Sequence, residues 1–295
     1  MPQRVDATAY YDFFPSTSHG PGDIWSALPS FGILSDPFVT GIVVTPACDL
    51  SNRKVETITF LPVLPLKRFL ASASYLPELK RAIAGQLQTA GLGKTLELGE
   101  GFSAAEDTDL RAGLQLLEEH VANSSTGKRE IAAAERAASG IRFMRESFTN
   151  DVGGPLLKYL EELLQVKDFD QTLRRLMTNG RPDTHFLPYD QQQADWSGIS
   201  EHSVALFRYP LSIPLAILDE AQSVADEQWA NSTQRLRRSV PCVSSFQQRP
   251  MKRLRMQPRF LTDLLTRFAA VFGRIGSPDF TEDTIIRFTA ELRNS

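Results

Sequence analysis

Two short runs of β-branched residues constrain the fold of this chain more than any other feature. Their sequences are VTGIVVTP at 39–46 and VETITFLPV at 55–63, and each has the length of one strand. The turn-forming residues Cys48–Asn52 separate them, so the pattern predicts an antiparallel β-hairpin. The second strand is expected to end at Leu61–Pro65, because proline cannot donate a ladder hydrogen bond. A further short strand is expected to open at Gly22–Trp25.

The pattern becomes helical between about residue 68 and residue 179. Leu79, Ile83 and Leu87 recur at intervals of four residues, which places them on one face of a helix. Further helices are predicted at 213–229, 258–273 and 281–292.

Strand-like runs return at 183–188 and 203–210. If both pair with the first strands, the helical segment is an insertion into, or a lobe beside, one β-barrel, and the chain has an α+β fold. This interpretation divides the chain into four parts: the first part of the barrel at 1–67, the helical insertion at 68–180, the remaining barrel strands and a helix at 181–230, and a basic linker with C-terminal helices at 231–295.

The composition is that of an ordinary globular protein, with 42% hydrophobic and 23% charged residues among 295. Two cysteines, Cys48 and Cys242, are too few for a disulfide scaffold. The N-terminal residues lack the basic start and apolar core of a signal peptide, and no apolar run approaches the roughly 20 residues needed to cross a bilayer. We therefore expect a cytoplasmic protein with reduced thiols.

Basic charge is concentrated near the end of the chain. The formal net charge is −3, and eight basic residues without an intervening acid leave −11 for the remainder. A polyanion or an acidic protein partner could neutralise such a run. The alternative is a solvated linker, or a rim that pairs with acids elsewhere in the chain. The eight residues are Arg235, Arg237, Arg238, Arg249, Lys252, Arg253, Arg255 and Arg259.

Four features of residues 22–66 occur together: the opening Gly22–Trp25, a strand ending in Ile42–Pro46, a turn at Asn52 and a second strand closing at Leu61–Pro62. In this combination the stretch resembles the MazF/PemK family, the small SH3-like barrels of bacterial toxin modules that cleave single-stranded RNA. The resemblance implies an SH3-like β-barrel built here from discontinuous strands. It also implies a bacterial origin and a toxin-like or antiviral-defence setting.

The family's chemistry is not expected to be shared. Members that cleave RNA generally place an arginine before the apolar strand and a serine or threonine after the proline that ends the next strand. Here those positions fall at about Val39 and Leu64. An apolar pair cannot supply acid–base catalysis or stabilise transition-state charge. A binding surface would be what remains, and we include Arg53, in the hairpin turn, among its candidate residues.

Cys48 and Asp49 are candidates for a second kind of chemistry. A cysteine nucleophile needs a neighbour that lowers its pKa, usually histidine, and His185 or His202 on the later strands could approach it. The favoured alternative is a small buried thiol with Asp49 capping the turn.

Metal and nucleotide sites are not predicted. The cysteines and the four histidines form no C-x-x-C or H-x-x-x-H pair, so no metal is expected. Gly91–Thr95 is expected to end a helix instead of cradling a phosphate, and no cofactor is predicted.

These patterns favour a non-catalytic binding or regulatory component that contacts nucleic acid or an acidic protein. Two alternatives are an endoribonuclease that uses other residues than the family's and a cysteine hydrolase centred on Cys48, with Asp49 and His185 as its candidate partners. The sequence does not indicate an oligomeric state.

Overall fold

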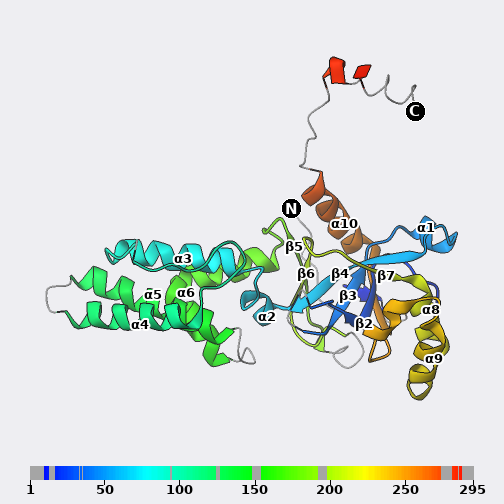
Figure 1. Ribbon diagram of the computed structural model, residues 1–295, viewed down its shortest axis with the longest axis horizontal. Coiled ribbons are helices and arrows are strands. Elements are labelled where there is room, and N and C mark those ends of the chain that lie inside the picture. Colours follow the sequence, from blue (N-terminus) through cyan, green and yellow to red (C-terminus); the bar gives the residue numbers. More distant parts are fainter. Residues whose placement is uncertain are drawn as a thin grey trace.

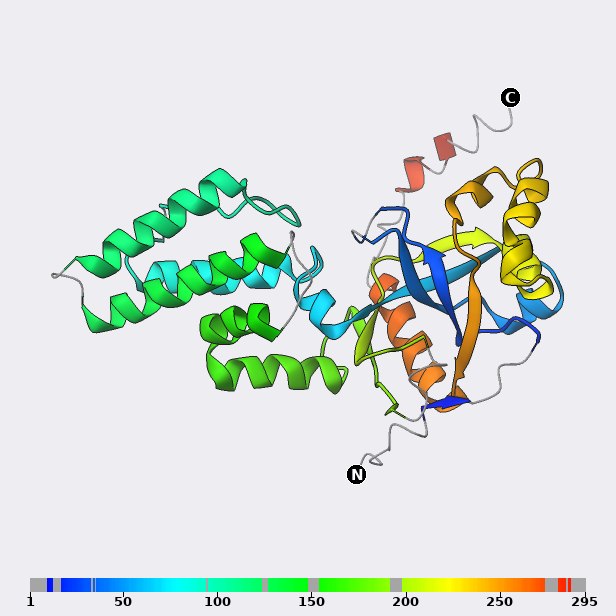
Figure 2. The ribbon, with the colours of Figure 1, turned by 90° about the horizontal axis from the view of Figure 1, so that it is seen from below.

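The sheet lies in one half of the molecule, and the long helices extend away from it (Figures 1 and 2). The computed structural model describes residues 10–12, 17–32, 34, 36–93, 95–123, 127–147, 154–191, 198–273, 281–284 and 286–287. Within this part, one open antiparallel sheet of eight strands combines with several helices. The predicted α+β class is confirmed.

Strands from both ends of the chain build the sheet. Their order is β1-β8-β2-β3-β4-β6-β5, and β7 pairs with β4. The predicted hairpin is confirmed, because β3 and β4 pair antiparallel. The strands are β1 (Tyr11–Asp12), β2 (Asp23–Pro29), β3 (Phe38–Val43), β4 (Thr57–Pro65), β5 (Thr184–Leu187), β6 (Ser203–Leu206), β7 (Leu211–Pro214) and β8 (Met251–Met256).

β4 continues through the prolines at which it was expected to end. Its first residues, Thr57–Phe60, pair with β7, and its last, Val63–Pro65, pair with β6. Pro62 falls between these two ladders, so its missing N–H interrupts neither of them. The strand therefore keeps a partner on each side over most of its length.

The helical block at 68–179 is also confirmed. Its helices are α2 (Leu66–Leu70), α3 (Leu76–Thr89), α4 (Asp107–Ala122), α5 (Lys128–Ser147) and α6 (Gly154–Met177), and α6 has a kink at Gln165. The predicted face of Leu79, Ile83 and Leu87 is buried. α5 packs against α3, α4 and α6, and its small side chains allow the close approach.

The predicted basic linker is a folded segment. It contains α9 (Trp229–Leu236), a 3₁₀ turn (Pro241–Ser245) and β8, which lies inside the sheet between β1 and β2. The helix expected at 213–229 is interrupted: α8 (Leu215–Ser223) follows β7 and a 3₁₀ turn (Asp226–Gln228) precedes α9. α10 (Pro258–Phe272) matches its prediction. Of the last predicted helix, only 281–284 and 286–287 lie among the described residues.

The sheet does not close into the expected barrel. β1 and β5 stand at the two ends of the strand order and have no ladder between them. Side chains bridge the gap between β1 and β5. The Tyr10 hydroxyl lies 2.7 Å from Nε2 of His185, and the Tyr11 hydroxyl donates to the Pro188 carbonyl at 2.8 Å.

Two apolar clusters cover the two faces of the sheet. One runs from Trp25 and Phe60 through Phe69 into the helical block, where it includes Ile83. The other lies between the opposite face and α10, with members that include Ile24, Ile42, Phe207 and Leu264. Among the described helices, none has the length and apolar character needed to span a membrane.

Candidate functional site

The basic residues predicted to bind a partner fall into two groups. Arg249, Lys252, Arg253 and Arg255 lie on or just before β8, where they contact other parts of the fold. Arg235, Arg237 and Arg238 lie at the end of α9. Arg259, in the first turn of α10, stacks over Phe260 with its guanidinium carbon 4.7 Å from the ring centre.

Asp23 neutralises two of the β8 cations. Its side chain is 0% exposed, its Oδ2 lies 2.7 Å from Nζ of Lys252, and its Oδ1 lies 2.6 Å from Nε of Arg255. Burial lowers the pKa of Lys252, although the hydrogen bond that Lys252 donates to Asp23 opposes this shift. For these residues the alternative of pairing with acids elsewhere in the chain is confirmed.

The other two cations of this group are also engaged. Arg249 Nε lies 2.5 Å from Oδ1 of Asp226, and Arg253 Nε donates to the Ser26 hydroxyl at 2.9 Å. The β8 group therefore holds the sheet together more than it offers charge to a partner.

Arg235, from the second group, and Arg53 both pair with acids of α8. Arg53 Nη1 lies 3.5 Å from Oδ2 of Asp219, and Arg235 pairs with the next residue, Glu220. His19 also bonds to Asp219, at 3.0 Å from Nε2 to Oδ1. Two adjacent acids of α8 thus bring together basic residues that lie far apart in the sequence.

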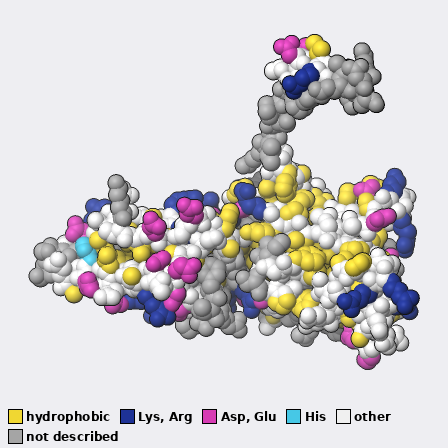
Figure 3. Space-filling model, viewed as in Figure 1, with side chains coloured by type: hydrophobic (Ala, Val, Ile, Leu, Met, Phe, Trp, Pro, Cys, Tyr) yellow, Lys and Arg dark blue, Asp and Glu magenta, His cyan; other side chains and the backbone are white. Residues whose placement is uncertain are grey.

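We call the resulting surface the basic end. Figure 3 shows Lys and Arg side chains gathered there, over α1 (Ala47–Ser51) and α9. Arg237 and Arg238 are exposed and have no ion-pair partner among the described residues. The basic end consists of Arg53, Lys54, Arg235, Arg237 and Arg238.

Cys48 is exposed, so the expectation of a buried thiol is wrong. It lies in the first turn of α1, with its Sγ 3.6 Å from Oδ1 of Asp49. Asp49 makes no capping hydrogen bond, since α1 has no side-chain cap. A short helix thus replaces the turn and points the thiol outward.

His185 lies at a different place, on β5, at the edge of the sheet away from α1 (Figures 1 and 2). Its Nδ1 lies 3.6 Å from the Asp263 carboxylate. Burial, and next the charge of Arg267, lower its pKa to about 3. The structure therefore does not bring His185 to Cys48, and His202 instead accepts a hydrogen bond from the Tyr189 N–H.

The two positions taken from the MazF/PemK pattern lie in the core. Val39 on β3 and Leu64 on β4 are both buried in the apolar cluster that reaches the helical block. No polar group stands at either position. Over the described part of the chain, no three His, Cys, Asp or Glu side chains gather closely enough to hold a metal ion.

The sequence did not reveal the acids that organise these charges. Asp23, Asp219 and Glu220 lie far along the chain from the cations they contact. The adjacent acids Asp219 and Glu220 could be noticed in the sequence, but which cations they contact depends on the tertiary fold. Lys54, which was not among the candidates, joins the basic end through its position beside Arg53.

Comparison of the chain with protein-family models, with curated proteins and with solved structures found no match. The candidate sites therefore depend on the chain's own residues and their geometry.

Proposed function

We propose that this protein is a non-catalytic binding component that contacts nucleic acid through its basic end. The observation that carries the proposal is the exposure of Arg237 and Arg238 without an acidic partner among the described residues. Arg53 and Arg235, which pair with the adjacent acids Asp219 and Glu220 of α8, and Lys54 belong to the same surface. A phosphate backbone would supply the negative charge that Arg237 and Arg238 lack.

The kind of contact follows from the composition of the surface. It consists of guanidinium and ammonium groups, which favour contacts to phosphates. Binding of this kind releases counterions and weakens as salt rises. If all five cations contact phosphates of a duplex, affinity falls about 10²- to 10³-fold between 50 and 200 mM salt.

The absence of catalysis is supported by the positions of Val39 and Leu64. Both are apolar and buried, where RNA-cleaving members of the MazF/PemK family have polar groups. We also propose that the sheet is an opened form of the family's SH3-like barrel. The hydrogen bonds that Tyr10 and Tyr11 make across the gap between β1 and β5 support this, and the bacterial defence setting follows from the same resemblance.

The binding proposal is tested by fluorescence anisotropy with a labelled 20-nucleotide RNA and a 20-base-pair DNA. The full chain is compared with an Arg237→Glu, Arg238→Glu double variant. Arg129→Glu, a charge reversal at an exposed position of α5, is the matched control. The double variant is expected to lose most of the affinity, and the control to bind as the original chain does.

Three outcomes would go against the proposal. If neither nucleic acid binds at 50 mM salt, an acidic protein surface is the remaining partner class. If the RNA is cut in the presence of a chelator, the endoribonuclease alternative is favoured. If a hydrolase activity is found and Cys48→Ala abolishes it, the cysteine alternative is favoured.

A further inference from the structure

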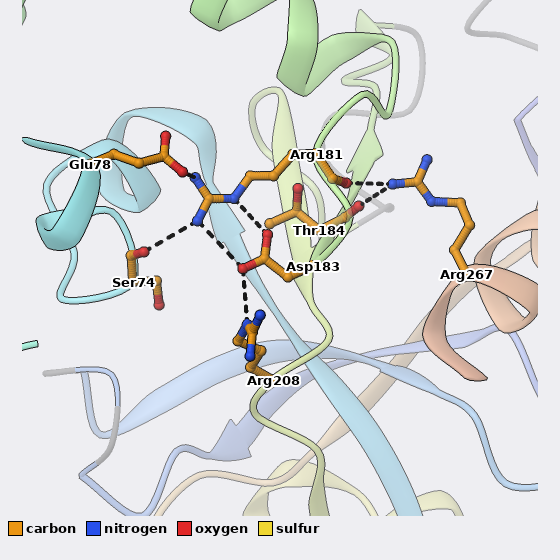
Figure 4. A network of polar contacts seen from close by, with 7 residues as sticks. All are labelled: Ser74, Glu78, Arg181, Asp183, Thr184, Arg208 and Arg267. Atoms are coloured by element: carbon orange, nitrogen blue, oxygen red, sulfur yellow. Dashed lines mark hydrogen bonds and ion pairs between the residues drawn. The ribbon is translucent and has the colours of Figure 1, made fainter. Parts of the chain in front are cut away.

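A second polar site lies where the helical block meets the sheet (Figure 4). A cavity of about 260 Å³ opens there, lined by α3 on one side and by the connections that lead into β5 and out of β6 on the other. Its volume is near the lower end of small-molecule pockets, which is about 300 Å³. The residues of the basic end do not line it.

Arg181 organises the wall of this cavity. Its Nε lies 2.6 Å from Oδ1 of Asp183, its Nη1 bonds to Glu78 of α3, and its guanidinium carbon lies 5.1 Å from the centre of the Phe69 ring. With 12% of its side chain exposed, Arg181 is fixed between the two halves of the molecule. It positions the wall and has few donors left for a ligand.

The carboxylate of Asp183 is also paired, with Arg181 and Arg208. Burial favours its neutral form, but the hydrogen bonds and charges of Arg181 and Arg208 outweigh burial and hold the pKa of Asp183 below its usual value. Arg208 Nε donates to Oδ2 of Asp183 at 3.1 Å. The acids of the wall are therefore already neutralised by arginines of the wall.

Two guanidinium groups keep donors available. Arg81, on α3, is exposed and has no hydrogen-bond or ion-pair partner among the described residues. Arg208 is 61% exposed and donates to Asp183 through its Nε, so that bond does not use its terminal nitrogens (Figure 4). With Arg181, Glu78 and Asp183, the lining carries one net positive charge.

The rest of the lining is partly apolar and contains an unsatisfied hydroxyl. Phe102, which is 57% exposed, and Tyr209 both line the cavity. The Thr184 side chain is buried, and its hydroxyl has no hydrogen-bond partner within the described part of the chain.

We propose that this cavity binds a phosphate monoester of a flat ring, with the phosphate between Arg81 and Arg208 and the ring against Phe102 and Tyr209. A phosphate offers three oxygens in different directions and can accept from two guanidinium groups on opposite walls. A carboxylate has two oxygens in one plane and bridges such a gap less well. This site is separate from the basic end, so it goes beyond the proposed function and can fail independently of it.

The test is isothermal titration calorimetry of the full chain with phenyl phosphate, inorganic phosphate and benzoate. Phenyl phosphate is expected to bind more tightly than the other two. Arg81→Gln, which has no internal partner to lose, and Arg208→Gln should each weaken binding about tenfold or more, since each removes a charged hydrogen bond. Arg129→Gln, far along the helical block, should leave the affinity unchanged.

Two further titrations identify the source of the phosphate. AMP represents a free nucleotide, and a 5′-phosphorylated hexanucleotide, compared with the same strand carrying a 5′-hydroxyl, represents a strand end. Binding of either phosphorylated probe that is lost in Arg81→Gln supports the site. Equal affinities for benzoate and phenyl phosphate, or binding that both arginine variants leave unchanged, would overturn it.

Discussion

Asp23 shows how a single buried carboxylate can determine the role of a charged segment. Its side chain is fully buried between Lys252 and Arg255. Removing one member of a buried ion pair leaves the other charges unpaired and costs about 3–5 kcal/mol. We predict that Asp23→Asn lowers the free energy of unfolding by about this amount in urea denaturation.

The matched control is Asp226→Asn, which removes the partner of Arg249. Asp226 is 65% exposed and Arg249 is 17% exposed, so this carboxylate is far less desolvated than that of Asp23 and its loss should cost less. If both variants lose the same stability, Asp23 has no special role in the sheet.

His185 makes the folding stability of the protein depend on pH. Burial and the charge of Arg267 lower its pKa to about 3, from an ordinary value of 6.5. Between these values the unfolded chain binds a proton that the folded chain excludes, so stability is lost as pH falls below 6.5. Between pH 7.5 and pH 5 this loss is about 2 kcal/mol.

Urea denaturation at the two pH values measures this effect. His185→Gln should remove most of the difference, and the remainder reflects His19, whose pKa burial also lowers. The prediction is wrong if the original chain is equally stable at both pH values.

Residue types were easier to predict than residue environments. The sequence identified all eight cations, but their partners lie elsewhere: Asp23 and Arg255 are 232 residues apart. The exposure of Cys48 was missed because a turn and a short helix have similar composition. Neither the partners of the cations nor the exposure of Cys48 can be predicted from the local sequence pattern alone.

At the scale of elements, the hairpin and the helices followed from their patterns, but β8 did not. Its sequence, MKRLRM, places Leu254 and Met256 two residues apart, and both are buried. This is the period of a strand with one buried face. The surrounding arginines obscured it, because solvated linkers share their composition.

The pairing of β3 with β4 depends on a glycine. A Cβ added to Gly41 would lie 2.4 Å from Cδ2 of Phe60 and 2.7 Å from Cδ1 of Leu28. Overpacking of this kind typically costs 1–3 kcal/mol, and we predict a loss of about this size for Gly41→Ala. Urea denaturation measures it.

Gly85, in the middle of α3, is the matched control. A Cβ added there meets no atom within 4 Å. Gly85→Ala should therefore stabilise the protein by about 0.5–1 kcal/mol through helix propensity. A destabilising Gly85→Ala or a neutral Gly41→Ala would contradict this account of the packing.

At the scale of the whole molecule, the division into strands, helices and strands was predictable, and the closure of the sheet was not. Alternation predicts which side chains share a face but not which strands become neighbours. Here α10 covers the face that carries Ile24 and Ile42. Because a helix buries this face, the sheet need not close on itself to remove it from water.

The helical block and the sheet share one apolar cluster, which runs from Trp25 through Phe69 to Ile83, and Arg181 joins them at its edge. We therefore predict that both halves unfold together. Two spectroscopic probes distinguish the unfolding of the two halves. The tryptophans, at 25, 196 and 229, lie outside 68–179 in the sequence, and Trp25 and Trp229 are buried outside the helical block, so fluorescence reports mainly on the sheet half. Circular dichroism reports mainly on the block, whose helices α3 to α6 have 14, 16, 20 and 24 residues.

Coincident urea transitions by the two probes are the signature of one cooperative unit. In Arg181→Met, Asp183 and Glu78 lose their shared partner at the junction, so we expect both transitions to shift to lower urea and to separate. Arg111→Met, which breaks an exposed pair within α4, should leave them coincident. Two separate midpoints in the original chain would mean that the shared cluster does not couple the halves, and the helical block would then be an independent folding unit.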